Sequence, residues 1–259
     1  MKVHKIESNN YIIHGDCFEG IDFLKSKNAV VNCVLTSPPY NTSRVGAKDK
    51  INSRYDSFKD KLTDEEYIEW TIKLFNEMDT VLENNGTILY NLSYSSENTD
   101  LIWKVIFNVI NSTNFTTADT ITWKKKSAVP NNRSANKLTR ICEFIFVFVR
   151  KNEMKTFKMN KKVVSQIEKT GQNNYENIYN FIEAKNNDGS CELNKATFST
   201  DLCTTLLNRY TSEGDRIFDP FSGTGTTSLA CKLSSRKFFG TELSEAQVEY
   251  TIDRVRKAN

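Results

Sequence analysis

The stretch Asp219-Pro220-Phe221-Ser222-Gly223-Thr224-Gly225-Thr226-Thr227 predicts the end of a strand, a glycine-rich turn and the start of a helix. Glycine lets the backbone turn tightly at a strand end and approach a ligand closely. Glu242 follows the next expected strand, 23 residues after Asp219, and doubly wound nucleotide folds place an acid at about this separation on ribose hydroxyls. Ser228 stands where the dinucleotide pattern has its third glycine, which argues against NAD. The stretch therefore predicts a nucleotide-type ligand site in a doubly wound fold.

A second stretch, Thr36-Ser37-Pro38-Pro39-Tyr40, follows the apolar residues 30–35. An apolar run of this length is typical of a strand buried on both faces of a parallel sheet. The prolines fix the backbone φ angle and hold a hydroxyl and an aromatic ring rigidly at the strand end. By itself the stretch reads as an ordinary rigid turn, but together with the glycine-rich turn it indicates an active site.

Alternating strands and helices predict an α/β fold with a doubly wound, mostly parallel sheet. We expect seven strands, at residues 11–15, 30–35, 87–92, 117–123, 142–149, 216–218 and 237–240. We expect one helix to begin at residue 63 and to end at residues 84–86. Other helices are expected at residues 17–25, 99–110, 202–209, 224–233 and 244–257, and a further helix within 175–184. Thr63 and Ser244 are the expected N-caps. The strand at 142–149 could pair antiparallel with 117–123, since no helix clearly separates them.

Composition favours a soluble globular protein of one or two domains. Of the 259 residues, 38% are hydrophobic and 26% are charged, as in ordinary globular domains. No apolar run approaches the roughly 18 to 20 residues that a membrane helix needs, and residues 1–10 do not resemble a secretory signal. We therefore expect a cytoplasmic protein without a membrane partner. The six cysteines include no Cys-x-x-Cys pair and there are only two histidines, so we expect neither a disulfide framework nor a metal site.

Charge is distributed unevenly along the chain. Residues 124–162 hold twelve lysines and arginines and two acidic residues, a net charge of +10 within a protein whose total is +3. A basic segment of this kind suits a protein that neutralises phosphates on one face. A solvated basic surface without a partner is an equally good explanation of the charge alone.

The two motifs, in this order, resemble those of the DNA methyltransferases that methylate exocyclic amino groups, specifically their β group. The resemblance covers nearly the whole chain, including His14-Gly15-Asp16-Cys17, Trp123-Lys124-Lys125, Glu143 and residues 195–202. It implies a seven-stranded, circularly permuted, Rossmann-like sheet with an inserted target-recognition region. Residues 1–150 would form the catalytic half, 151–194 the target-recognition region and 195–259 the cofactor-binding half.

The same resemblance implies S-adenosylmethionine as the cofactor. The glycine-rich turn would lie beside its methionine part, Glu242 would hold the ribose, and Asp16 would lie near the adenine. Phe198, Thr200 and Asp201 would cover the methionine end. The implied cofactor-binding residues are Asp16, Thr36, Phe198, Thr200, Asp201, Asp219, Pro220, Phe221, Ser222, Gly223, Gly225, Thr226 and Glu242.

The implied reaction is difficult because the lone pair of an exocyclic amine is delocalised into the base. Ser37 Oγ and the Pro38 carbonyl would accept its N–H bonds, and Tyr40 would stack on a base flipped out of the duplex. The expected catalytic residues are thus Ser37, Pro38, Pro39 and Tyr40, acting mainly by positioning and without a metal. Family members with serine at the Ser37 position usually methylate cytosine N4 and those with aspartate adenine N6. We therefore expect cytosine N4 methylation, with adenine as the close alternative.

Double-stranded DNA is the expected substrate, in a restriction–modification system. The candidate DNA-binding residues are Arg44, Trp123, Lys124, Lys125, Arg133, Lys137 and Arg140. Trp123 is an equally good candidate for the core. The resemblance also makes a cognate restriction endonuclease and a homodimer plausible. Alternatives are amine methylation of RNA or of protein glutamine, and a DNA-binding regulator with an inactive methyltransferase fold. The regulator would be expected to lack Ser37, Tyr40 or the glycine turn, which this chain retains.

Overall fold

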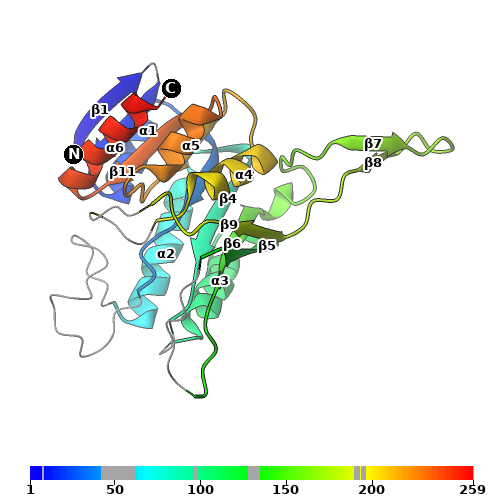
Figure 1. The fold of residues 1–259 in the computed structure, drawn as a ribbon, viewed down its shortest axis with the longest axis horizontal. Helices are drawn as coiled ribbons and strands as arrows, with labels where there is room; N and C mark the ends of the chain where they lie inside the picture. Colours follow the sequence, from blue (N-terminus) through cyan, green and yellow to red (C-terminus); the bar gives the residue numbers. More distant parts are fainter. Residues whose placement is uncertain are drawn as a thin grey trace.

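The computed structural model describes residues 1–7, 9–41, 62–95, 98–127, 135–189, 193 and 197–258. Nine strands of this part of the chain form one sheet in the order β1-β2-β11-β10-β3-β4-β6-β5-β9 (Figure 1). Their bounds are β1 (Lys2–Glu7), β2 (Asn10–His14), β3 (Val31–Thr36), β4 (Leu82–Leu92), β5 (Phe115–Lys125), β6 (Cys142–Arg150), β9 (Phe181–Ala184), β10 (Arg216–Asp219) and β11 (Lys237–Glu242).

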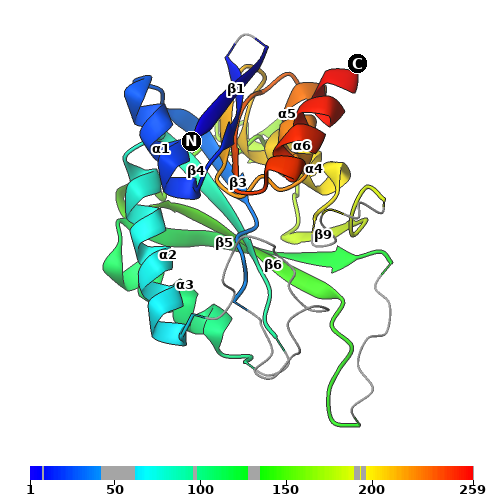
Figure 2. The same ribbon diagram turned by 90° about the vertical axis from the view of Figure 1, so that its left-hand side faces the viewer.

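Helices cover both faces of this sheet, as Figure 2 shows. One face carries α1 (Cys17–Ser26), α2 (Asp64–Asp79) and α3 (Leu101–Ser112), and the other carries α4 (Thr200–Tyr210), α5 (Thr226–Leu233) and α6 (Glu245–Lys257). Each helical layer buries its own apolar cluster against the sheet. A short 3-10 helix, η1 (Lys151–Glu153), follows β6. Beyond it, β7 (Val163–Gln166) and β8 (Asn173–Tyr175) form a separate hairpin that projects from the body (Figure 1).

The strand order confirms the circular permutation. Five neighbouring strands, β2, β11, β10, β3 and β4, run parallel, so the two C-terminal strands fill the gap between β2 and β3. Strand β6 runs antiparallel to both β4 and β5, as the missing helix between residues 123 and 142 allowed. All seven predicted strands are present. Two edge strands, β1 beside β2 and β9 beside β5, enlarge the sheet to nine.

Three local predictions are wrong. Residues 181–184 of the helix expected within 175–184 form strand β9, because alternate residues Ile182 and Ala184 are buried. Residues 84–86 do not end α2, which stops at Asp79; β4 already begins at Leu82, which pairs with Val31. Ser244 occupies the N-cap position of α6 without a side-chain cap bond.

The capping box predicted at Thr63 is confirmed. Its side chain accepts a hydrogen bond from the Glu66 amide at 3.2 Å, and the Glu66 carboxylate accepts one from the Thr63 amide at 2.8 Å. These bonds satisfy donors that every helix N-terminus leaves unpaired.

Most of the cysteines in the described ranges are buried. Cys17, Cys33, Cys203 and Cys231 are buried free thiols, and Cys191 lies outside the described residues. Within those ranges no His, Cys, Asp and Glu side chains gather as a metal-binding group. No helix there has the length and apolarity required to cross a bilayer.

Candidate active site

The two motifs meet at the carboxyl edge of the parallel strands. Strands β3 and β10 are hydrogen-bonded neighbours, with Cys33 opposite Ile217 and Val34 opposite Phe218. Thr36 ends β3 and Asp219 ends β10, and the Thr36 hydroxyl donates to Asp219 Oδ1 at 2.7 Å. Open α/β sheets bind ligands at this edge. The sheet therefore places the proline-containing turn and the glycine-rich turn side by side.

Asp219 is buried and organises the start of its own turn. Its Oδ1 also accepts a hydrogen bond from the Phe221 amide at 3.1 Å. Burial raises the pKa of the Asp219 carboxyl to about 6, although the hydrogen bonds that it accepts oppose the shift. The carboxyl thus joins two strand ends and fixes the backbone that follows.

The glycine-rich turn depends on left-handed backbone conformations. Gly223 has φ +52° and Gly225 has φ +75°, which residues with a Cβ adopt only at a cost. A Cβ on Gly225 would lie 2.3 Å from Thr251 Cγ2 of α6. Thr251 Oγ1 in turn donates to the Gly223 carbonyl at 3.1 Å. The turn is therefore pressed against α6, and its second glycine has no room for a side chain.

Glu242, at the end of β11, holds the same turn from the other side. Its Oε2 accepts from the Gly223 amide at 3.0 Å, and its Oε1 accepts from the Ser244 amide at 2.9 Å. Burial raises the pKa of Glu242, against the effect of these hydrogen bonds. Asp16 follows the neighbouring strand β2 and is the N-cap of α1, with Oδ1 accepting from the Phe18 and Glu19 amides at 2.8 and 2.9 Å. Both acids thus lie at adjacent strand ends.

The residues expected to cover the methionine end begin α4. Phe198 is buried and Asp201 is exposed in the first turn of the helix. The Thr200 amide donates to Asp188 Oδ1 at 2.8 Å, and the Thr200 hydroxyl also bonds to Asp188. Asp188 forms an ion pair with Arg254.

Arg254 connects this segment to the glycine-rich turn. Its Nη1 donates to the Thr224 carbonyl at 3.1 Å and to Thr226 Oγ1 at 3.2 Å. Sequence reasoning missed both Asp188 and Arg254, because each is an ordinary charged residue far from any motif. Asp188 and Arg254 together connect the start of α4 to the glycine-rich turn.

The proline-containing turn is anchored from α2. The phenol of Tyr67 donates to the Pro39 carbonyl at 2.7 Å, and both prolines are buried. Ser37 Oγ and the Tyr40 hydroxyl lie 2.8 Å apart. The turn therefore holds the hydroxyls of Ser37 and Tyr40 together on a rigid backbone.

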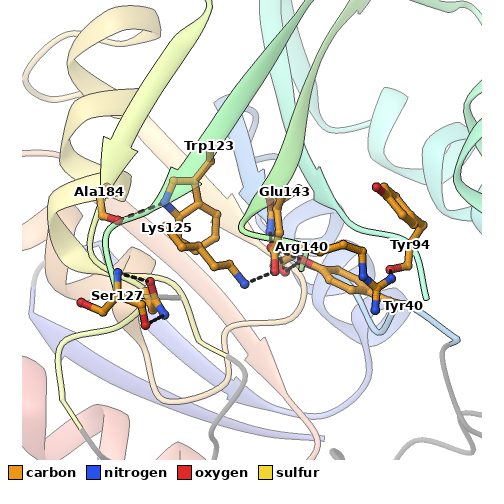
Figure 3. Close-up of polar contacts among 11 residues, drawn as sticks. Tyr40, Tyr94, Trp123, Lys125, Ser127, Arg140, Glu143 and Ala184 are labelled. Carbon is orange, nitrogen blue, oxygen red and sulfur yellow. Dashed lines mark hydrogen bonds and ion pairs between the residues drawn. The ribbon is translucent and has the colours of Figure 1, made fainter. Parts of the chain in front are cut away.

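A partly buried polar network extends from Tyr40 into the sheet (Figure 3). The Tyr40 hydroxyl donates to Glu143 Oε2 at 3.1 Å. Asn91 Nδ2 lies 2.9 Å from the same Glu143 oxygen and 2.5 Å from the Tyr40 hydroxyl. Lys125 forms an ion pair with the other oxygen, Glu143 Oε1. Four segments, the turn after β3 and strands β4, β5 and β6, thus contribute to one cluster.

Asn91 is the member of this cluster that sequence reasoning missed. A polar residue within the otherwise apolar run 88–92 was the available signal. Asn91 Oδ1 is buried and has no hydrogen-bond partner among the described residues. A buried acceptor of this kind costs about 1–3 kcal/mol unless a donor reaches it.

The candidate DNA-binding residues have different environments. Trp123 is 2% exposed, with its indole N–H 3.4 Å from the Ala184 carbonyl, so the structure places it in the core. Lys124 forms an ion pair with Glu183 at 2.7 Å. Arg140 bonds to the Tyr94 carbonyl and lies 5.2 Å from that ring's centroid (Figure 3). Lys137 is exposed. Arg44 and Arg133 lie outside the described residues.

The basic segment 124–162 does not form one face. Because β6 runs antiparallel to β4, the residues after Arg150 lie at the amino edge of the parallel strands, opposite the two motifs. There the Lys158 amide bonds to the Asn85 carbonyl, and its ammonium bonds to Asp215 at 2.9 Å. Among the described residues of the segment, Lys125 and Glu143 lie beside the candidate active site.

Comparison with known proteins matches this geometry to a family. The N6/N4 methyltransferase family model, described as DNA methylase, matches residues 31–253. The type II methyltransferase M.Cfr9I of Citrobacter freundii is 24% identical over 98% of this chain and 91% of that protein. M.SmaI of Serratia marcescens is 25% identical over 94% of this chain and 90% of that protein.

Solved structures agree on the fold. The complex of M1.HpyAVI with SAM has a TM-score of 0.64 at 24% identity, covering 94% of this chain and 98% of that one. The cytosine-N4-specific PvuII DNA methyltransferase has a TM-score of 0.66 at 16% identity, covering 97% and 94%. Both share the Rossmann-like architecture over almost the whole length of the chain.

Proposed function

The chain belongs to the N6/N4 DNA methylase family, and from this premise we propose that it methylates the N4 amine of a specific cytosine in duplex DNA. S-adenosylmethionine is the methyl donor, and the biological setting is a type II restriction–modification system. The observation that carries the proposal is the hydrogen bond between Thr36 and Asp219. It brings the proline-containing turn and the glycine-rich turn to one edge of the sheet, as transfer between two bound molecules requires.

The residues of the cofactor half fit S-adenosylmethionine. Gly223 and Gly225 expose the backbone of the turn at two positions, and the Glu242 carboxylate, at the end of the next strand, suits ribose hydroxyls. Asp16 uses one carboxylate oxygen, Oδ1, for its cap bonds, and its other oxygen suits the adenine end. When bound, the cofactor supplies an electrophilic methyl group on a sulfonium centre. Phe198, Thr200 and Asp201 are proposed to enclose its methionine end.

The catalytic half supplies acceptors and a stacking surface for the target base. Ser37 Oγ and the Pro38 carbonyl are proposed to accept the two N–H bonds of the exocyclic amine, which frees its lone pair. The ring of Tyr40 stacks on the flipped base.

Ser37 favours cytosine over adenine. Its neutral hydroxyl stands where adenine-methylating members of the family usually carry a carboxylate. Adenine N6 remains the second candidate, because the amine chemistry and the cofactor site are the same for both bases. We further propose that residues 151–194 recognise the target sequence, that Lys124, Lys125, Lys137 and Arg140 contact DNA together with Arg44 and Arg133, and that a cognate endonuclease exists.

Methyl transfer from tritiated S-adenosylmethionine to unmethylated DNA tests the proposal. After enzymatic digestion, chromatography of the nucleosides should place the label in N4-methylcytosine. Label in N6-methyladenine would instead support the second candidate. Label in RNA or in protein glutamine, with none in DNA, would refute the choice of DNA as the substrate.

A further inference from the structure

Glu143 is a carboxylate placed unusually deep for a residue without an assigned role. It belongs to the apolar strand β6, and its side chain is 14% exposed. A carboxylate in such a place needs a charge partner and hydrogen bonds. Lys125 of β5 pairs with Oε1, while Tyr40 and Asn91 both bond to Oε2. These three residues are the charged and polar groups that face it from the neighbouring elements.

Counting donors and acceptors fixes the direction of the hydrogen bonds. An ionised carboxylate only accepts, whereas a phenol has one proton to donate. Tyr40 must therefore give its proton to Glu143. In the 2.8 Å contact between Ser37 and Tyr40, either hydroxyl could in principle be the donor. Because the Tyr40 proton is already used, Ser37 has to donate. Ser37 Oγ also accepts a hydrogen bond from Asn91 Nδ2 at 3.3 Å, and its second lone pair is then left to accept a hydrogen bond from a ligand.

We propose that Glu143 is a positioning residue that makes Ser37 an acceptor toward the target amine. The directed chain runs from Ser37 through Tyr40 to Glu143, and the charge at its end polarises both hydroxyls. Lys125 holds the carboxylate in place through its second oxygen. This inference rests on the proposed function, in which Ser37 accepts an N–H of the base. In this role Glu143 orients the hydrogen bonds between Ser37 and Tyr40 and takes up no proton.

The Glu143→Gln substitution removes the requirement that Tyr40 donate to residue 143, and it nearly preserves the shape of the side chain. The amide can present its NH2 group to the Tyr40 oxygen, which lets Tyr40 donate to Ser37. Ser37 would then turn its own proton toward the amine, so that a donor faces a donor. Tyr40→Phe breaks the same chain at its middle link and keeps the aromatic ring for stacking.

A double-mutant cycle on the full-length protein tests this chain. Single-turnover methyl transfer from tritiated S-adenosylmethionine to unmethylated DNA is measured for the wild type, E143Q, Y40F and the double variant. We expect each single substitution to slow transfer by about tenfold or more, with cofactor affinity by calorimetry and the thermal midpoint nearly unchanged. The double variant should be no more than about threefold slower than the slower single variant, because contacting residues that act as a unit are not additive.

The matched control is E77Q, which breaks an ion pair of 2.6 Å with Lys25 on the helices far from the site. It should transfer methyl groups at the wild-type rate. An E143Q variant with wild-type rate, or a double variant whose loss equals the product of the two single losses, would overturn the role of Glu143. If E143Q does not fold, K125M replaces it in the cycle. K125M should then slow transfer in the wild-type background and have little effect in the Y40F background, and equal effects in both would refute the chain.

Failure of the proposed function looks different. In that case the wild type itself transfers no label to DNA, and the cycle has no rate to compare. Normal wild-type transfer with an additive cycle rejects only the role assigned to Glu143.

Discussion

The hydroxyl of Thr36 reaches the carboxyl of Asp219 at 2.7 Å across 183 positions of sequence. Both groups are buried, and the pKa of Asp219 is raised to about 6 by that burial. A raised carboxyl pKa means that the folded state binds this proton more tightly than the unfolded chain does. The protonation state of Asp219 in its contact with Thr36 therefore depends on pH.

Asp219→Asn should change the pH dependence of stability. The contribution of the Asp219 proton is fully present below the unfolded pKa near 4 and is lost as pH rises toward about 6. By linkage, the wild type should lose on the order of 3 kcal/mol relative to D219N over this interval. Urea unfolding of both proteins at pH 4, 5, 6 and 7 measures the difference. A gap between the two that does not change with pH would contradict the raised pKa.

Gly225→Ala should damage the cofactor turn. The new Cβ would lie 2.3 Å from Thr251 Cγ2 in a left-handed conformation, which alone costs about 1–2 kcal/mol. We expect cofactor affinity to fall at least tenfold by calorimetry, together with a lower thermal midpoint. Gly171→Ala is the matched control, since Gly171 has φ +68° and nothing within 4 Å of a Cβ. Equal losses of thermal midpoint in both variants would show that backbone strain alone, rather than the collision, is responsible.

Tyr40→Ala should weaken methyl transfer far more than cofactor binding. The substitution removes both the stacking ring and the hydroxyl that contacts Ser37 and Glu143. Base–aromatic stacking alone is worth about 1–3 kcal/mol, so turnover should fall at least tenfold. Turnover assays and calorimetry with S-adenosylmethionine separate the two effects. Parallel losses in both measurements would reject the role in binding the base.

Arg254→Gln should weaken the contacts that connect α4 to the glycine-rich turn. The substitution removes the ion pair with Asp188 and weakens the contacts with Thr224 and Thr226. Thr224 and Thr226 are buried, so we expect the KM for S-adenosylmethionine to rise about threefold to tenfold while kcat changes less. Asp188→Asn should produce the same shift from the other side of the ion pair. A change confined to kcat would contradict a role in holding the cofactor.

The fold was largely predictable because its signals are local. Apolar runs such as 30–35 and the capping box at Thr63 depend on neighbouring residues, and the structure confirms them. Strand β9 was not predictable in this way, since its burial comes from pairing with Thr122 to Lys125 rather than from its own sequence. The same limit explains the division of the basic segment. Its charges are contiguous along the chain, but the reversal at β6 separates them in space.

The candidate site divides along similar lines. Ser37, Tyr40, Gly225 and Glu242 belong to motifs whose residues are adjacent in sequence. Asn91 belongs to the site only because β4 lies beside β3. Asp188 and Arg254 form an ion pair across 66 residues of sequence, and no motif near either residue indicates this contact. Contacts made by sheet order and by loop closure were thus the ones that sequence reasoning could not supply.

The circular permutation has a consequence for how the protein folds during its synthesis on the ribosome. Strands β2 and β3 are made early, but β11 and β10, which separate them, are encoded near the end of the chain. A nascent polypeptide therefore carries an open gap in its central sheet until residues 216–242 have been made. Such distant pairings make folding slow. A polypeptide that has not reached residue 219 lacks Asp219 as well as the glycine-rich turn, so it cannot form the contact with Thr36 that joins the two halves of the candidate site.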